Sequence, residues 1–407
     1  MSEQNSDFTR RKFIATSVGC LAAASLAGVA PGVATAEDKK STATKGKMVE
    51  RKLGKTGLTL PIVSMGAGAA NDPGLVVACY EAGMRHFDTA VSYAYGRNEQ
   101  MVGQALAKMG VRKQSVIATK LHTTAQRASI TSPAQSKKMM ASTMEASLKR
   151  LKTDYVDILY IHDVRDAATC TDEAIMEGLA EIKKQGKARF IGISTHSDMA
   201  NVVNATTDAG IYDVVLTSIN FTMVNDTALL NAIKKAADKG LGVIGMKTQA
   251  GGGNFPNPDT QRDYSGEVIN SAAFKWAMRN ENICTAITGI SNHDHMRFNT
   301  GYAADLDMTA EESKFLADNS IILSMGFCSQ CRQCLASCPK NSEIPDLMRT
   351  HMYATQYADF AKAKRTLKTI PNGLGLDACA SCPSCTASCA NSVDIPKKIE
   401  QLKEIYA

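Results

Sequence analysis

Eight of the twelve cysteines in this 407-residue chain lie between positions 328 and 389. They form two runs with the same spacing, C-x2-C-x2-C-x3-C. Three closely spaced thiolates can bind three corners of an iron–sulfur cube, while the fourth cysteine reaches a neighbouring cluster. The spacing therefore predicts two [4Fe–4S] clusters, one held by Cys328, Cys331, Cys334 and Cys389 and the other by Cys379, Cys382, Cys385 and Cys338.

These cysteines could also form disulfides or bind zinc. An exported protein could pair them as disulfides, but cysteines separated by only two residues are poor partners for one another. Structural zinc would use Cys-x2-Cys pairs and leave the middle cysteine of each run without a role. The second run ends in Ala390 where the first has Pro339, so the two turns are not identical. Iron–sulfur clusters remain the favoured interpretation.

The elements before the cysteines alternate between short apolar runs and helical periodicity. Eight such runs predict a (β/α)8 TIM barrel over residues 48–310, with a hairpin at 51–60 below it. A doubly wound sheet would need G-x-G-x-x-G after the first strand, and the segment from Gly66 lacks the third glycine. Residues 311–407 are predicted to form a largely helical, ferredoxin-like module with two clusters, with helical spacing over 344–370. The expected strands are 61–66, 84–88, 116–120, 155–162, 190–194, 214–220, 241–247 and 285–289. Expected helices between them include 74–82, 99–108, 136–151 and 173–185.

Several motifs give the barrel segment a family resemblance. They are Phe87-Asp88-Thr89-Ala90-Val91-Ser92-Tyr93, the strand at 116–120, the segments 154–162 and 186–194, and Ile287-Thr288-Gly289-Ile290-Ser291-Asn292. In this order they resemble the aldo/keto reductase family over residues 52–299. The cysteine tail resembles the ferredoxin-bearing branch of that family.

The resemblance implies a catalytic tetrad, and all four positions are filled: Asp88, Tyr93, Lys120 and His162. A carbonyl that receives hydride needs a proton donor, and a free phenol, with a pKa of about 10, is a poor acid at neutral pH. A neighbouring ammonium lowers that pKa, so Lys120 is expected to activate Tyr93. Asp88 would hold Lys120, and His162 would orient the substrate oxygen.

The resemblance also implies a nicotinamide nucleotide, NADP(H). Ser194 and Thr195 correspond to the carboxamide site, with Thr195 replacing a common Asn, and Met246 stands where an aromatic residue often stacks on the ring. A glycine run beginning at Gly251 could hold the pyrophosphate through backbone N–H groups. The full expected set is Ser194, Thr195, Asn220, Met246, Gly251, Gly252, Ser291, Arg297 and Asn299.

The N-terminal segment has the three parts of an export signal. The Arg10-Arg11 pair matches the twin-arginine pattern, an Ala- and Gly-rich run follows, and Ala34-Thr35-Ala36 is a small-x-small cleavage site. This predicts a twin-arginine signal peptide at 1–36, a polar linker at 37–47, and a periplasmic or otherwise exported protein with no stable membrane span. A disordered arm with a chance arginine pair is the alternative.

Together these features predict an exported oxidoreductase that interconverts a small-molecule carbonyl and an alcohol. Its clusters would exchange electrons with a redox partner protein or a quinone-linked carrier. The alternative is an electron-transfer protein whose barrel is an inactive scaffold or a nucleotide sensor. A net charge of +6, with no dense basic run interleaved with aromatics, argues against nucleic-acid binding.

Overall fold

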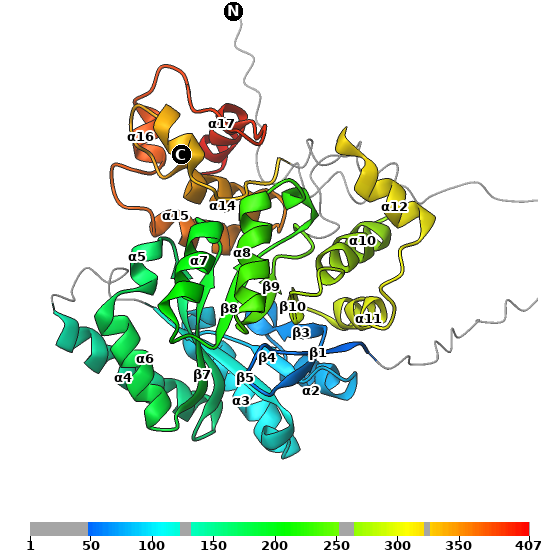
Figure 1. Cartoon of the computed structure of the whole chain (residues 1–407). Helices are drawn as coiled ribbons and strands as arrows, with labels where there is room; N and C mark the ends of the chain where they lie inside the picture. Colours follow the sequence, from blue (N-terminus) through cyan, green and yellow to red (C-terminus); the bar gives the residue numbers. More distant parts are fainter. Residues whose placement is uncertain (1–47, 123–131, 252–263, 321–325, 407) are drawn as a thin grey trace, which may run out of the picture. The chain divides into compact units, whose positions relative to one another are not determined.

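The computed structural model describes residues 48–122, 132–251, 264–320 and 326–406. The predicted signal peptide at 1–36 and linker at 37–47 lie outside these residues. Eight parallel strands close into a barrel in the order β10-β3-β4-β5-β6-β7-β8-β9, which confirms the TIM-barrel prediction (Figure 1). The strands are β3 (Val63–Gly66), β4 (His86–Asp88), β5 (Val116–Leu121), β6 (Val156–Val164), β7 (Ala188–Thr195), β8 (Val214–Ser218), β9 (Gly242–Met246) and β10 (Thr285–Gly289).

A short antiparallel hairpin precedes the barrel. Strand β1 (Glu50–Lys52) pairs with β2 (Thr59–Pro61), as predicted. Leu53 and Leu60 are fully buried and join an apolar cluster with inward-facing strand residues such as Ile158. The hairpin therefore supplies part of the packed barrel interior, which in this fold is filled by side chains.

Helices surround the strands, and most begin with a side-chain cap. Asp72, Ser132, Asp172 and Ser265 each accept a hydrogen bond from a backbone N–H of the first turn, which satisfies a donor that the helix itself cannot. The longer helices are α2 (Pro73–Glu81), α3 (Arg97–Met109), α4 (Pro133–Leu151), α6 (Glu173–Lys184), α7 (Met199–Ala209), α8 (Thr227–Asp238), α10 (Gly266–Met278), α11 (His293–Tyr302) and α12 (Ala310–Ala317). The short segments are η1 (Ala67–Ala69), η2 (Tyr93–Gly96), η3 (Arg112–Gln114), α5 (Ala167–Cys170) and η5 (Phe221–Met223).

The last of these helices, α12, packs against the barrel. Glu312 of α12 pairs with Lys275 of α10 at 3.0 Å, and both side chains are buried. The same carboxylate group accepts a hydrogen bond from Ser271. The boundary predicted at 310–311 thus falls at the start of a helix that packs against a barrel helix.

The residues after 326 form a helical module with its own core. Its elements are η6 (Gln333–Ser337), α14 (Ile344–Thr355), α15 (Phe360–Lys368), α16 (Leu376–Ala380) and α17 (Ile395–Tyr406), drawn in orange and red in Figure 1. Leu347, Ile399 and Leu402 are buried in this core beside the cysteine loops. The helical stretch predicted at 344–370 is broken into α14 and α15, with Ala358 between them in a left-handed conformation at φ 50°. Within the described ranges no helix has the length and apolarity needed to span a membrane.

Candidate active site

The strand register brings Asp88 and Lys120 together at the carboxyl end of the barrel. Asp88 ends β4, and Lys120 lies near the end of the neighbouring strand β5. The Lys120 ammonium donates to the Asp88 carboxylate and, at 2.8 Å, to the Thr89 carbonyl oxygen. Both side chains are almost fully buried, and burial raises the pKa of Asp88 and lowers that of Lys120. The two opposite charges are in direct contact, which offsets part of the free-energy cost of burying them.

Tyr93 and His162 complete the expected group of four. Lys120 Nζ lies 5.2 Å from the centroid of the Tyr93 ring. The Tyr93 and His162 rings meet edge to face at 5.7 Å between centroids, and the His122 ring lies 5.0 Å from that of His162. His162 stands where the β6–β7 register shifts between Ile161 and Val164. The structure thus brings all four predicted residues to one end of the barrel, where the active sites of this fold form.

The protonation of Tyr93 and His162 differs from what the sequence predicts. Burial, followed by the charge of Asp88, raises the pKa of Tyr93, although Lys362 opposes this. The net shift is therefore upward, opposite to the lowering that was expected from Lys120, because burial and the charge of Asp88 dominate it. Burial and then Lys120 lower the pKa of His162 well below its usual value. A neutral phenol and a neutral imidazole therefore face each other, and both can hydrogen-bond to a substrate oxygen.

Three of the expected nucleotide residues lie at or after the ends of β7 and β8. Ser194 and Thr195 are buried, and the Thr195 hydroxyl is bonded to the carbonyl oxygens of Val164 at 2.7 Å and Ser197 at 2.8 Å. Asn220 is fully buried; its side-chain oxygen accepts from Thr222, while its Nδ2 has no partner among the described residues. A buried amide donor without a partner is uncommon, and it fits an acceptor such as a carboxamide oxygen.

The other expected nucleotide residues are spread along the following loops. Met246 ends β9, and Gly251 lies against Gln356 of the module, while Gly252 falls outside the described residues. Ser291 Oγ is 3.1 Å from His295 Nδ1. Arg297 is exposed and pairs with Asp294, and Asn299 is buried, accepting from Gln249 at 3.1 Å.

The structure brings two groups of cysteines together in the module. Cys328, Cys331, Cys334 and Cys389 line one hollow. The Cys379 thiol is close enough to Cys338 and Cys385 for each to raise its pKa, after the larger effect of burial. Within the described ranges no three His, Cys, Asp or Glu side chains converge as around a single metal ion. Four thiols around a hollow fit a cluster of several metal atoms.

Hydrogen-bond donors and cations surround these sulfurs. The backbone N–H of Gln330 donates to Cys328 Sγ at 3.4 Å, and that of Asn391 donates to Cys389 Sγ at 3.3 Å. The Cys328 thiolate would raise the pKa of the Lys398 ammonium, against the larger effect of burial, which lowers it. Such donors and charges are among the features that set cluster potentials.

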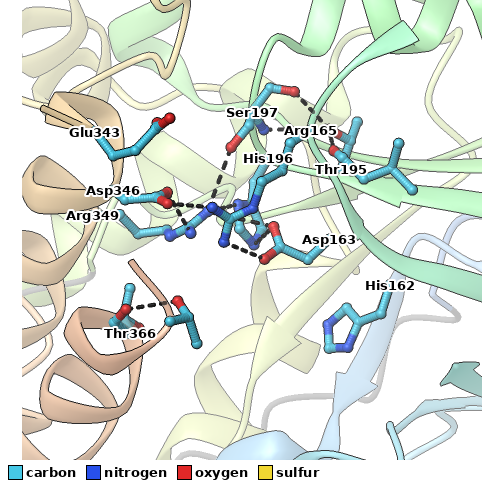
Figure 2. Close-up of polar contacts among 12 residues, drawn as sticks. His162, Asp163, Arg165, Thr195, His196, Ser197, Glu343, Asp346, Arg349 and Thr366 are labelled. Carbon is cyan, nitrogen blue, oxygen red and sulfur yellow. Dashed lines mark hydrogen bonds and ion pairs between the residues drawn. The ribbon is translucent and has the colours of Figure 1, made fainter. Parts of the chain in front are cut away.

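The sequence reasoning missed a polar network that joins the module to the barrel. Arg349 of α14 lies 2.7 Å from His196 Nδ1, and it pairs with Asp346 at 2.6 Å and Asp163 at 3.4 Å. Arg165 bridges Asp163 and Asp346. Figure 2 shows these side chains meeting beside His162. The spacing of Asp346 and Arg349 places both on one face of a helix, but it does not reveal their partners on the barrel.

Comparisons with known proteins agree with this architecture. Residues 70–267 match the aldo/keto reductase family, and residues 327–394 match the 4Fe-4S dicluster domain. The chain is similar to the L-galactose dehydrogenase of Arabidopsis thaliana, with 27% identity over 68% of this chain and 95% of the relative. It is also similar to a probable voltage-gated potassium channel subunit beta of Oryza sativa subsp. japonica, with 33% identity over 37% of this chain and 47% of that one.

A solved structure shares the fold. The aldo-keto reductase AKR11C1 of Bacillus halodurans superimposes with a TM-score of 0.55 at 22% identity, over 66% of this chain and 95% of that one. The dicluster match falls on the helical module, and the reductase match falls on the barrel that holds Asp88, Tyr93, Lys120 and His162. The chain is therefore an oxidoreductase that combines an aldo/keto reductase domain, matched over residues 70–267, with a C-terminal 4Fe-4S dicluster domain.

Proposed function

We propose that this oxidoreductase interconverts a small carbonyl compound and an alcohol with NADP(H), and exchanges electrons through two [4Fe–4S] clusters. The observation that carries the proposal is the contact between Tyr93 and His162 beside the buried Lys120–Asp88 pair. A barrel that served only as a scaffold would not need a charged pair buried at its carboxyl end, because burying two charges is costly.

The residues of the chain would manage the proton and the developing charge. When bound, the nucleotide supplies or accepts hydride, and the clusters supply or accept single electrons. Tyr93 would donate its phenolic proton to the substrate oxygen, and neutral His162 would orient that oxygen by a hydrogen bond. The positive end of the Lys120–Asp88 pair would stabilise the negative charge that develops as the proton moves.

Both kinds of cofactor have residues that fit them. Asn220 Nδ2 offers a buried donor to the nucleotide, with Ser194, Met246, Gly251 and Asn299 along the same strand ends and loops. Cys328, Cys331, Cys334 and Cys389 would hold one cluster, and Cys379, Cys382, Cys385 and Cys338 the other. A redox partner protein or a quinone-linked carrier would then take electrons from the module or deliver them to it.

A second candidate is an electron-transfer protein whose barrel is inactive. It is favoured by the Thr195 hydroxyl, which is engaged by backbone groups, and by Arg297, which is paired with Asp294 rather than free for a phosphate. The Oryza relative is named as a channel subunit rather than as an enzyme.

We also propose export through the twin-arginine pathway, because Arg10-Arg11 and the following apolar run have the composition of such a signal. This pathway suits proteins that bind their cofactors before export. Outside the cytoplasm there is no recycled pool of NADP(H), so a tightly bound nucleotide recycled by the clusters would explain the fusion of the two domains.

Tyr93→Phe tests the enzyme proposal directly. Wild type and variant are isolated anaerobically from the periplasmic fraction and assayed with NADPH and a panel of small aldehydes and ketones. Loss of the proton donor should lower kcat by about 10² to 10⁴-fold, the usual range for a general acid, with unchanged cluster EPR signals.

The exposed neighbour Tyr95, changed to Phe, is the matched control and should keep wild-type activity. Equal activity of the Tyr93→Phe variant and the wild type would overturn the assignment of Tyr93. A wild type that reduces no member of the panel would favour the electron-transfer candidate, and recovery of the protein only from the cytosol would contradict export.

A further inference from the structure

The iron–sulfur module places a tyrosine between two lysines at the mouth of the barrel. Tyr353 of α14 is 5% exposed. Lys362 of α15 has its ammonium 4.2 Å from the centroid of the Tyr353 ring, and Lys247, directly after β9, has its ammonium 5.5 Å from the same centroid. Among the described residues neither lysine forms an ion pair with a carboxylate. Two cations that share one phenol favour the phenolate.

This tyrosine lies close to the catalytic pair. Tyr353 and Lys362 both act on the pKa of Tyr93, and Lys362 also acts on that of His162. The module therefore brings an ionisable phenol and a cation within electrostatic reach of the two residues assigned to proton transfer. The barrel contributes the third member of this group, Lys247.

The buried polar network fixes the position of Tyr353. Arg349 and Tyr353 are four residues apart in α14, so they lie on the same face of the helix. Arg349 is held by Asp163 and His196 of the barrel, and Asp163 directly follows His162 in the chain. Figure 2 shows Arg349 reaching from α14 toward Asp163 beside His162. Arg349, which holds α14 against the barrel, thus contacts the residue directly after His162 in the chain.

We propose that Tyr353 is a second acid–base residue of the barrel active site, supplied by the iron–sulfur module, with Lys247 and Lys362 as positioning residues that stabilise its phenolate. This inference rests on the proposed carbonyl–alcohol chemistry. In alcohol oxidation the substrate O–H bond would break and its proton would pass to the Tyr93 oxygen as the Tyr93 proton passes to the Tyr353 phenolate, while the substrate C–H pair would leave as hydride to the nicotinamide nucleotide. In reduction the same path runs backward: Tyr353 returns its proton to Tyr93, and Tyr93 donates its own to the substrate oxygen.

The surrounding charges shift the pKa values of Tyr353 and Tyr93 in opposite directions. Burial raises the pKa of Tyr353, and Asp163 acts in the same direction, but Lys247, Lys362 and Arg349 outweigh both and lower the pKa to about 8. The pKa of Tyr93 is raised instead. Near neutral pH, Tyr93 is then suited to donate a proton, and Tyr353 is the tyrosine that can also accept one.

The test is a phenolate titration by near-ultraviolet difference spectra, on the anaerobic holoprotein without substrate. Wild type should show a tyrosine that ionises near pH 8, and Tyr353→Phe should lack it. Lys362→Met should move that ionisation toward pH 10, the ordinary value for a phenol. The control is Tyr406→Phe, in the same module, whose hydroxyl only donates to the Phe360 carbonyl oxygen at 3.2 Å. It should keep both the titration and the turnover.

Turnover gives the second readout. Tyr353→Phe should lower kcat about 10²-fold or more in the oxidation direction and remove the rise in rate near pH 8. Iron content and Trp276 fluorescence confirm that each variant is folded. A titration unchanged in Tyr353→Phe, or an unchanged pH profile, would overturn the proposal. Because the titration needs no substrate, its result is independent of the activity assay of Tyr93→Phe, which tests the proposed function.

Discussion

At the scale of single residues, the site combines buried charge with backbone strain. Ala94 and Tyr95, directly after Tyr93, have φ of 48° and 57°, in the left-handed region that non-glycine residues rarely adopt. Asp163, directly after His162, has φ 55°. Strained backbone persists where the surrounding structure requires it, and such positions cluster at functional sites. Both proton-transfer residues are therefore held next to strained positions.

Removal of Arg349 should loosen the module from the barrel. The Arg349→Met change would remove one cation from the buried Asp346 and the partly buried Asp163, which keep Arg165 and His196 among their partners. Loss of one partner from a buried ion pair costs about 3 to 5 kcal/mol, and the remaining partners should reduce this by roughly half. Hydrogen exchange should therefore speed up in α14 and at the end of β6.

Lys403→Met provides the control, because Lys403 pairs with Glu400 at the surface, where a pair contributes about 0 to 1 kcal/mol. Equal exchange in the two variants would show that Arg349 does not hold the module in place.

At the scale of elements, we expect the two cysteine loops to exchange their last ligands. Cys389, from the second run, lines the hollow formed by the first three cysteines of the first run. Cys389→Ala should therefore lose the same cluster as Cys328→Ala, and a different one from Cys379→Ala. Each variant should lose about four iron atoms per chain, and the remaining EPR signals identify the cluster that is lost. Spectra in which Cys389→Ala resembles Cys379→Ala would contradict the crossed assignment.

The sequence predicted most elements of the barrel because their local patterns decide them. All eight strands, the hairpin and the helices α2, α3, α4 and α6 lie within a few residues of the expected ranges. The break between α14 and α15 was missed, because 344–370 has no glycine or proline between Ile344 and Ile370 except Pro345 at the helix start. The turn there depends on packing, since α14 is buried along nearly its whole length.

At the scale of the molecule, the polar network that joins the module to the barrel could not be predicted from local patterns. The tetrad was predictable because each member follows a strand motif of the barrel. Arg165 and Asp346 are separated by 181 positions, and Arg349 and Asp163 by 186. Nothing in the spacing of either segment indicates such a pairing. The raised pKa of Tyr93 was likewise missed, because it depends on the burial of Tyr93 itself and then on the nearby charge of Asp88.

The barrel and the module share a boundary at the barrel mouth. One hollow is lined by His196, Ser218 and Lys247 of the barrel together with Cys328 and Lys398 of the module. A ligand of the first proposed cluster thus lies on the same hollow as residues at the ends of β7, β8 and β9. Short separation favours electron exchange between a nucleotide at these strand ends and that cluster.

Reduction of the oxidised, anaerobic protein by NADPH tests whether the barrel and the clusters form one electron-transfer unit. One NADPH gives two electrons and a proton, enough to reduce each of two clusters once. We expect NADPH to produce the EPR signal of reduced [4Fe–4S] clusters, and Cys328→Ala to weaken that signal more than Cys379→Ala. If NADPH gives no signal in protein that gives full cluster signals with dithionite, the barrel and the clusters do not exchange electrons.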